Sequence, residues 1–189
     1  LTKPLRDRGL LTGFAIAAEA YQQLKDVEGV LKTIKQAVEL GFPEPYFAKT
    51  LLELYYSLGE HTKLLEVWEK VKNDLTLSFH ALVTMIKFFG VTENLEEARK
   101  LYERARKKHK ANIHYINRVY IRFVLVNMPE AELYRFIKNI RESGELTSEE
   151  YSCFLEALYD WGKYEDVLRF SLALTEEPRL QSPEAKTIY

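Results

Sequence analysis

The clearest pattern of apolar and polar positions lies between Asn94 and Lys110, in the segment NLEEARKLYERARKKHK. Its apolar or small residues recur at intervals of three, four and one, which places them on one stripe of a 3.6-residue helix. Asn94 precedes the stripe and Glu97 follows three residues later, as in a capping box. Glu96 precedes Lys100 by four residues, a spacing that favours an ion pair on the helix surface. The segment therefore predicts an amphipathic helix whose stripe consists of Leu95, Ala98, Leu101, Tyr102 and Ala105.

The same pattern recurs along the chain every 33 to 35 residues. Three further columns, three residues after, seven before and ten before the position of Ala98, are also nearly all apolar. A period of this length is typical of stacked helical hairpins, because one hairpin cannot bury its apolar face alone. We therefore predict an all-α protein, a right-handed α-solenoid of about five helix-turn-helix repeats of 33–35 residues. The positions matched to Ala98 are Leu31, Leu65, Leu133 and Leu168, and those ten residues earlier are Tyr21, Tyr55, Phe88, Phe123 and Leu158.

Turn residues divide the chain into one lead-in and one repeat domain. Pro4 disfavours a helix through residues 1–11, so we expect a lead-in there and a single solenoid domain over 12–189. Gly59, Gly90 and Gly162 are expected to break the first helix of their repeats from the second. The expected helices cover 12–24, 26–40, 46–58, 61–72, 78–89, 94–110, 112–125, 129–144, 147–161 and 164–175. The expected repeats are 12–45, 46–76, 77–111, 112–146 and 147–181, with the start of a sixth at 182–189.

Charge is unevenly distributed, although the net charge of the 189 residues is only -1. Between Arg99 and Lys110 there are seven Lys or Arg residues against one Glu. Such a cluster can contact phosphates, but cations are also favoured at any helix C-terminus by the helix dipole. Both interpretations apply to Arg104, Arg106, Lys107, Lys108 and Lys110.

No residue pattern indicates catalysis, a metal or a cofactor. The four histidines and the single Cys153 lack metal-ligand spacing, and phosphate-binding and nucleophile motifs are not found. We interpret Cys153 as a small residue on an apolar face. The sequence contains no run of about 18 apolar residues, so it predicts no membrane span. The chain starts at Leu1 rather than Met, so we expect it to be part of a longer protein.

Two segments resemble pentatricopeptide repeats: ELGFPEPYFAKTLLELYYSLGEHTKLLEVWEKV and ESGELTSEEYSCFLEALYDWGKYEDVLRFSLAL. Both have a Gly-containing turn, an aromatic opening to the first helix, an "LG" or "WG" break and an aliphatic second helix. The tetratricopeptide pattern fits less well, because its glycine lies inside the first helix. The segment EEARKLYERARKKHKANIHYINRVYIRF is similar to half-a-tetratricopeptide repeats.

The resemblance implies binding of single-stranded RNA by a concave surface of first helices, with one base read per repeat. It also implies a mitochondrial or other organellar location, with a cytoplasmic one as the alternative. In the family, a small polar residue early in the first helix reads the base. That position falls on Thr50 in the second repeat and on Cys153 in the fifth, and elsewhere on Ile16, Ala81 or Arg118.

Three basic residues extend the RNA hypothesis beyond the Arg99–Lys110 cluster. Arg118 and Arg122 lie four residues apart on one expected first helix, and Lys87 lies on the preceding first helix. Together they predict a basic stripe on the surface of first helices. Tyr46, Tyr115 and Tyr151, at the starts of first helices, either stack bases or staple neighbouring repeats.

The sequence therefore leaves three functions open. The first is a non-catalytic RNA-binding protein in organellar RNA metabolism or translation. The second is a protein–protein interaction scaffold with a tetratricopeptide-like groove, and the third is a non-catalytic arm of a larger enzyme. A continuous positive stripe on the first helices would favour RNA, whereas a mixed or apolar lining would favour a protein partner.

Overall fold

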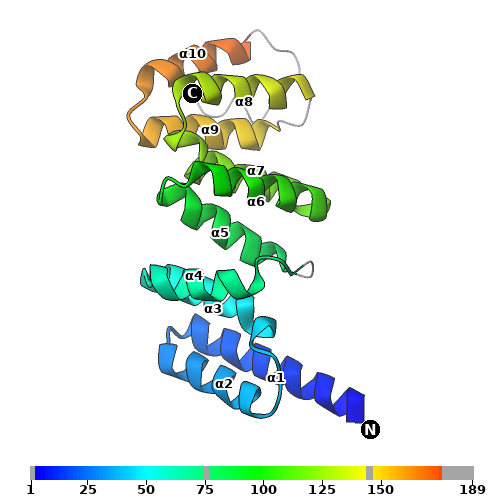
Figure 1. Ribbon diagram of the computed structural model, residues 1–189. Helices are drawn as coiled ribbons and strands as arrows, with labels where there is room; N and C mark the ends of the chain where they lie inside the picture. The colour runs from blue at the N-terminus through cyan, green and yellow to red at the C-terminus, as the bar shows by residue number, and fades with distance from the viewer. Residues whose placement is uncertain (1–2, 75–76, 144–146, 176–189) are drawn as a thin grey trace. The chain divides into compact units, whose positions relative to one another are not determined.

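The helical periodicity of the sequence becomes ten α-helices in the described part of the chain (Figure 1). The computed structural model describes residues 3–74, 77–143 and 147–175. No strand occurs in these three ranges, so the prediction of an all-α protein is confirmed. Three short 3₁₀ segments, Glu44–Phe47, Lys110–Asn112 and Leu125–Asn127, join some of the helices. The helices are α1 (Lys3–Gln23), α2 (Val27–Glu39), α3 (Ala48–Leu58), α4 (His61–Val71), α5 (Phe79–Val91), α6 (Leu95–Lys108), α7 (Ile113–Phe123), α8 (Glu130–Ser143), α9 (Ser148–Asp160) and α10 (Tyr164–Thr175).

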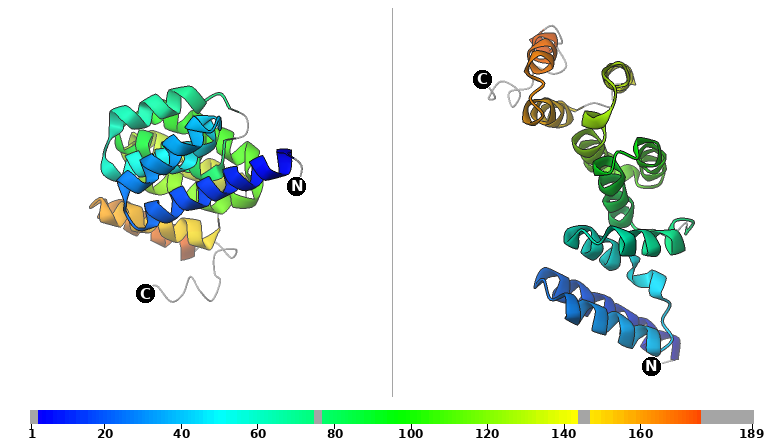
Figure 2. Two further views of the ribbon diagram at one scale, coloured as in Figure 1. Left: turned by 90° about the horizontal axis from the view of Figure 1, so that it is seen from below. Right: turned by 60° about the vertical axis from the view of Figure 1, so that its left-hand side comes forward.

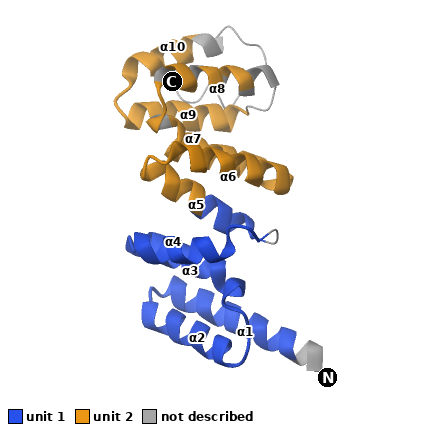
Figure 3. Cartoon of the chain, in the orientation of Figure 1, with its two compact units in different colours: residues 1–84 blue, residues 85–189 orange. Residues whose placement is uncertain are grey.

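The chain divides into two compact units, residues 1–84 and 85–189 (Figure 3). In the first unit, α1 packs along α2 and α3 packs along α4. The lengthwise contact of α1 with α2 is visible in the right-hand view of Figure 2. In the second unit, α7 packs against α6 and α9, and α9 packs against α10. Each unit is therefore built from helices that bury apolar faces against helices near them in sequence.

Polar side chains cap several helices, including the one for which Asn94 was the predicted cap. The Asp26 carboxylate accepts a hydrogen bond from the Gly29 amide at 2.9 Å, and the Asn94 side chain accepts one from the Glu97 amide at 3.4 Å. Thr147 and Glu150 form the reciprocal capping box that their spacing predicts. These caps satisfy amides that the first turn of a helix leaves unpaired.

The first helix begins earlier than expected. α1 starts at Lys3 and continues to Gln23, so residues 3–11 of the expected lead-in are helical. Pro4 lies in the first turn, where its missing N–H is not needed for an intrahelical bond. The proline therefore marks the start of this helix rather than a break.

Gly90 is not the break between two helices, because α5 runs through it to Val91. A Cβ built on Gly90 would collide with the backbone carbonyl of Phe123 in α7. The Asn127 side chain also donates a hydrogen bond to the Gly90 carbonyl at 2.9 Å. Gly90 thus permits close packing of α5 and α7. It is one of the three glycines whose expected place between helices favoured the pentatricopeptide pattern, and it lies inside a helix instead.

The turn within a helix pair has the same geometry in four repeats. Its left-handed residue is Lys25, Gly59, Glu93 or Gly162, with φ of 59°, 68°, 60° and 71° respectively. In each turn the amide of the next residue donates to a carbonyl five positions earlier at 2.9 Å. This is the helix C-terminal motif in which glycine is usual, although Lys and Glu occupy two of the four positions here.

These turns correct the alignment of the repeats by one residue. Counting from the turns, the positions equivalent to Ala98 are Val30, Leu64 and Val167. With Leu133 kept in the fourth repeat, the steps are 34, 34, 35 and 34 residues. Val30, Leu64, Ala98 and Leu133 each have no exposed surface. The residues first aligned with Ala98 in the other helices, Leu31, Leu65 and Leu168, are 38%, 37% and 66% exposed. The first alignment was therefore wrong in three repeats.

The column ten residues earlier is only partly core. Phe88 and Leu158 are buried, but Tyr21 is 39% exposed. The column seven residues before Ala98 ends the first helices, and Leu24, Leu58, Val91 and Trp161 in it are all exposed. The expected helix end at Gly144 and the expected start of a sixth repeat at 182–189 lie outside the described residues.

Candidate functional site

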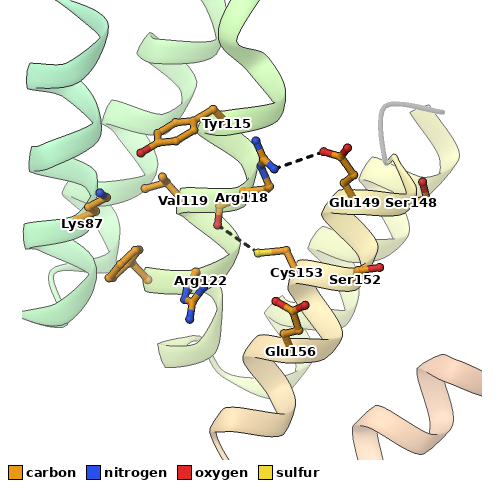
Figure 4. A pocket seen from close by; sticks show the side chains of 11 residues that line it. Lys87, Tyr115, Arg118, Val119, Arg122, Ser148, Glu149, Ser152, Cys153 and Glu156 are labelled. Carbon is orange, nitrogen blue, oxygen red and sulfur yellow. Dashed lines mark hydrogen bonds and ion pairs between the residues drawn. The ribbon is translucent and has the colours of Figure 1, made fainter. Parts of the chain in front are cut away.

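The second unit contains an open groove whose floor is α7, between α5 and α9 (Figure 4). Its volume is about 940 Å³. Tyr115, Val119 and Phe123 lie four residues apart on α7, so one helix face presents them to the groove. Val119 is buried and Tyr115 is 43% exposed. The floor is therefore largely apolar.

The α5 wall and the α7 floor of the groove carry the three cations that the sequence grouped together. Lys87 comes from α5, and Arg118 and Arg122 come from α7 (Figure 4). The ammonium of Lys87 lies 5.6 Å from the ring centroid of Phe123, a cation–π distance. The structure thus brings these predicted residues to one site.

The opposite side of the groove is hydroxylic and acidic. It is built by α9 from Ser148, Ser152 and Glu156, together with Glu149. Figure 4 shows these side chains along the helix that faces Arg118 and Arg122. This wall was not predicted from the sequence, although the spacing 148, 152, 156 on a capped helix indicates it.

Two of the groove's cations are paired with α9. An Arg118 guanidinium nitrogen lies 3.3 Å from a Glu149 carboxylate oxygen, and one of Arg122 lies 3.9 Å from an oxygen of Asp160. The lining is consequently mixed in charge rather than a continuous positive stripe.

Cys153 also lines the groove, where its thiol donates to the Arg118 carbonyl at 3.8 Å. Burial raises the pKa of the Cys153 thiol above its ordinary value, and the charge of Glu156 adds to the rise. The thiol is therefore protonated at neutral pH and poorly nucleophilic.

A buried polar network behind the groove fixes α7 against α9. The Glu150 carboxylate, with no exposed surface, accepts hydrogen bonds from the Asn117 amide at 2.6 Å and from the Thr147 backbone and hydroxyl at 2.8 Å each. His114 Nδ1 lies 3.3 Å from the same carboxylate. The Asn117 carbonyl accepts from the Tyr102 hydroxyl at 2.9 Å, which extends the network to α6. A single chain of polar contacts thus orients three helices.

The basic cluster at the end of α6 and the start of the following 3₁₀ segment does not line the groove. Arg104 and Arg106 are half-buried, whereas Lys107, Lys108 and Lys110 are exposed. The Arg106 guanidinium lies 5.4 Å from the ring centroid of Tyr102. Among Arg104, Arg106, Lys107, Lys108 and Lys110, the exposed residues are therefore the three lysines.

Thr50 is 4% exposed in the core of the first unit, so its hydroxyl is not presented to a base. Tyr151 is buried and donates its hydroxyl to the Phe170 carbonyl at 2.7 Å, so it staples α9 to α10. Tyr46 is 64% exposed in the first unit. Of Thr50 and the three tyrosines Tyr46, Tyr115 and Tyr151, only Tyr115 lines the groove.

Within the three described ranges, His, Cys, Asp and Glu side chains form no group of three or more that would hold a metal ion. Among the helices described, none has the length and apolar character needed to cross a membrane.

Comparison with protein-family models, with curated proteins and with solved structures finds no match. The class of the protein accordingly follows from its own fold, which is all-helical and built from paired helices.

Proposed function

We propose that the chain is a non-catalytic helical-repeat module that binds a polypeptide segment of a partner protein in the groove of α5, α7 and α9. The observation that carries the proposal is the mixed lining of this groove, where two arginines are already paired with carboxylates over an apolar floor. A polyanion would meet Glu149 and Glu156 there, whereas a polypeptide has both charges and apolar groups to offer. The regular steps of 34, 34, 35 and 34 residues support a right-handed α-solenoid as the scaffold.

Panning of a displayed library of random dodecapeptides on the immobilised chain tests this function. Ser152→Trp, which places a large side chain on the half-exposed α9 wall, serves as the groove-blocking variant. We expect peptides enriched on the wild type to lose at least about tenfold in affinity on this variant. Lys32→Glu on an exposed position of α2 is the matched surface control and should leave binding unchanged. Absence of enriched peptides, or equal binding to the blocked variant, would refute the proposal.

A second candidate function is binding of single-stranded RNA by the exposed lysines at the end of α6, with the organellar role that the family resemblance implies. Three exposed cations within four residues, Lys107, Lys108 and Lys110, favour it. Binding to a single-stranded RNA pool at two salt concentrations, with duplex DNA as control, measures this activity. If charge reversal of the three lysines leaves both affinity and its salt dependence unchanged, the cluster is not an RNA contact.

A further inference from the structure

Some charged side chains of the groove form ion pairs within the chain, and others do not. Arg118 and Arg122 have carboxylate partners on α9. Lys87 and Glu156 form no ion pair with any other described residue, and both line the groove. The groove therefore offers one cation and one anion to a ligand.

These two charges lie on opposite walls. Lys87 extends from α5 and Glu156 from α9, with the α7 floor between them (Figure 4). An anionic ligand would be attracted to Lys87 and repelled by Glu156. A cationic ligand would be attracted to Glu156 and repelled by Lys87. A ligand with both charges satisfies both walls, which is the condition for electrostatic complementarity.

The length of the floor limits the size of the bound segment. Tyr115 to Phe123 spans eight residues of helix, or about 12 Å at 1.5 Å per residue. An extended chain advances about 3.3 Å per residue, so roughly four residues fit along this floor. Successive side chains of an extended chain point in opposite directions, so neighbours reach opposite walls.

We infer that the groove selects an extended polypeptide segment that presents an acidic side chain to Lys87 and a basic side chain to Glu156, at adjacent positions or three apart. This inference rests on the proposed function and specifies its ligand. The apolar stems of the segment pack on Tyr115 and Val119, and the two charges fix its direction.

The same peptide library tests the inference through the composition of the enriched pool. On the wild type, we expect enriched sequences to contain an acidic and a basic residue at one of the two predicted spacings. On Lys87→Glu the acidic residue should be lost from the enriched sequences, and on Glu156→Lys the basic residue should be lost. Lys32→Glu should select the same pool as the wild type.

One enriched peptide then gives a quantitative result. Its affinity, measured by fluorescence anisotropy, should fall about three- to tenfold on Lys87→Glu, and replacing its acidic residue by Arg should restore binding to that variant only. Circular dichroism of each variant confirms that it is folded.

Three results would overturn the inference, and they differ in what they leave standing. Enriched peptides that Ser152→Trp blocks but that carry no charge pair leave the proposed function intact. Absence of enrichment removes both proposals. Single-stranded RNA that binds the wild type and loses affinity on Lys87→Glu would assign the groove to nucleic acid instead.

Discussion

Glu150 is the residue on which the orientation of α7 and α9 depends most directly. Its carboxylate is wholly buried, and its hydrogen-bonding partners come from α7 and from the cap of its own helix. A buried charge is tolerated when its lone pairs are satisfied, and the groups that satisfy it become costly to leave alone.

Glu150→Ala is expected to lower the free energy of unfolding by about 2–4 kcal/mol, because it strands the buried Asn117 amide and removes half of the capping box. Urea denaturation measures the loss. Glu149→Gln is the matched control, since its side chain is 74% exposed, and should change stability by less than about 0.5 kcal/mol. Equal effects of the two substitutions would contradict the network.

The buried phenol of Tyr102 should make the stability of the protein depend on pH in the alkaline range. Burial raises the pKa of its phenol above the ordinary value, against a smaller opposing effect of Arg106. Above about pH 10 the unfolded chain therefore loses a proton that the folded chain keeps, so stability falls as pH rises.

Between pH 9 and 11, the free energy of unfolding of Tyr102→Phe should fall less steeply than that of the wild type, by up to about 1.4 kcal/mol per pH unit. Tyr46→Phe, at an exposed position, should not change the slope. Loss of the hydrogen bond to Asn117 shifts the whole curve by about 1 kcal/mol without changing its slope. Parallel curves for Tyr102→Phe and the wild type would disprove the expectation.

At the scale of elements, close packing of α5 on α7 depends on the absence of a side chain at position 90. Gly90→Ala is expected to cost about 1–3 kcal/mol, because the atom that a Cβ would meet is the backbone carbonyl of Phe123. Gly13→Ala is the control, since a Cβ there meets nothing within 4 Å in the middle of α1. That substitution should be neutral or stabilise by up to about 1 kcal/mol. Thermal unfolding of both variants decides the matter, and a neutral Gly90→Ala would mean that α5 and α7 lie further apart.

The two tryptophans occupy opposite environments in their helix pairs. Trp68 in α4 is 4% exposed and Trp161 after α9 is 44% exposed. Trp68→Ala should therefore cost about 3–5 kcal/mol and Trp161→Ala less than about 2 kcal/mol, as measured by chemical denaturation. A loss below about 0.5 kcal/mol at Trp68 would place it outside the core.

At the scale of the whole molecule, the division into two units predicts that a destabilising substitution loosens only the unit that contains it. Stability in repeat arrays is a sum of terms within repeats and between neighbours. Glu150→Ala should raise amide hydrogen exchange in α7 and α9 by about tenfold or more and leave α1 and α2 unchanged. An equal increase in α2 would show that the chain opens as one cooperative unit.

Much of the fold was predictable because its signals are local. The period of the apolar residues and the capping residue Asn94 predicted helices whose ends fall within a few residues of those observed, except at the start of α1. The exact alignment of the repeats was not predictable from apolarity. Val30–Leu31 and Leu64–Leu65 are each two adjacent apolar residues, and hydrophobicity alone cannot tell which of the two is buried. The turns decide it, and two of them use Lys25 and Glu93 where glycine is the expected residue.

The candidate site was likewise only partly predictable from the sequence. The sequence by itself determined the helices and the arginine pair on the floor of the groove, because the spacing of Arg118 and Arg122 on one helix is a local property. Only the tertiary structure decided that Glu149 and Glu156 face them, that Thr50 is buried and that Gly90 is a packing position. The physical reason is that periodicity and capping act within a turn or two of helix. Burial and charge pairing depend instead on which helix packs opposite, and residues more than 25 positions away in sequence set that packing.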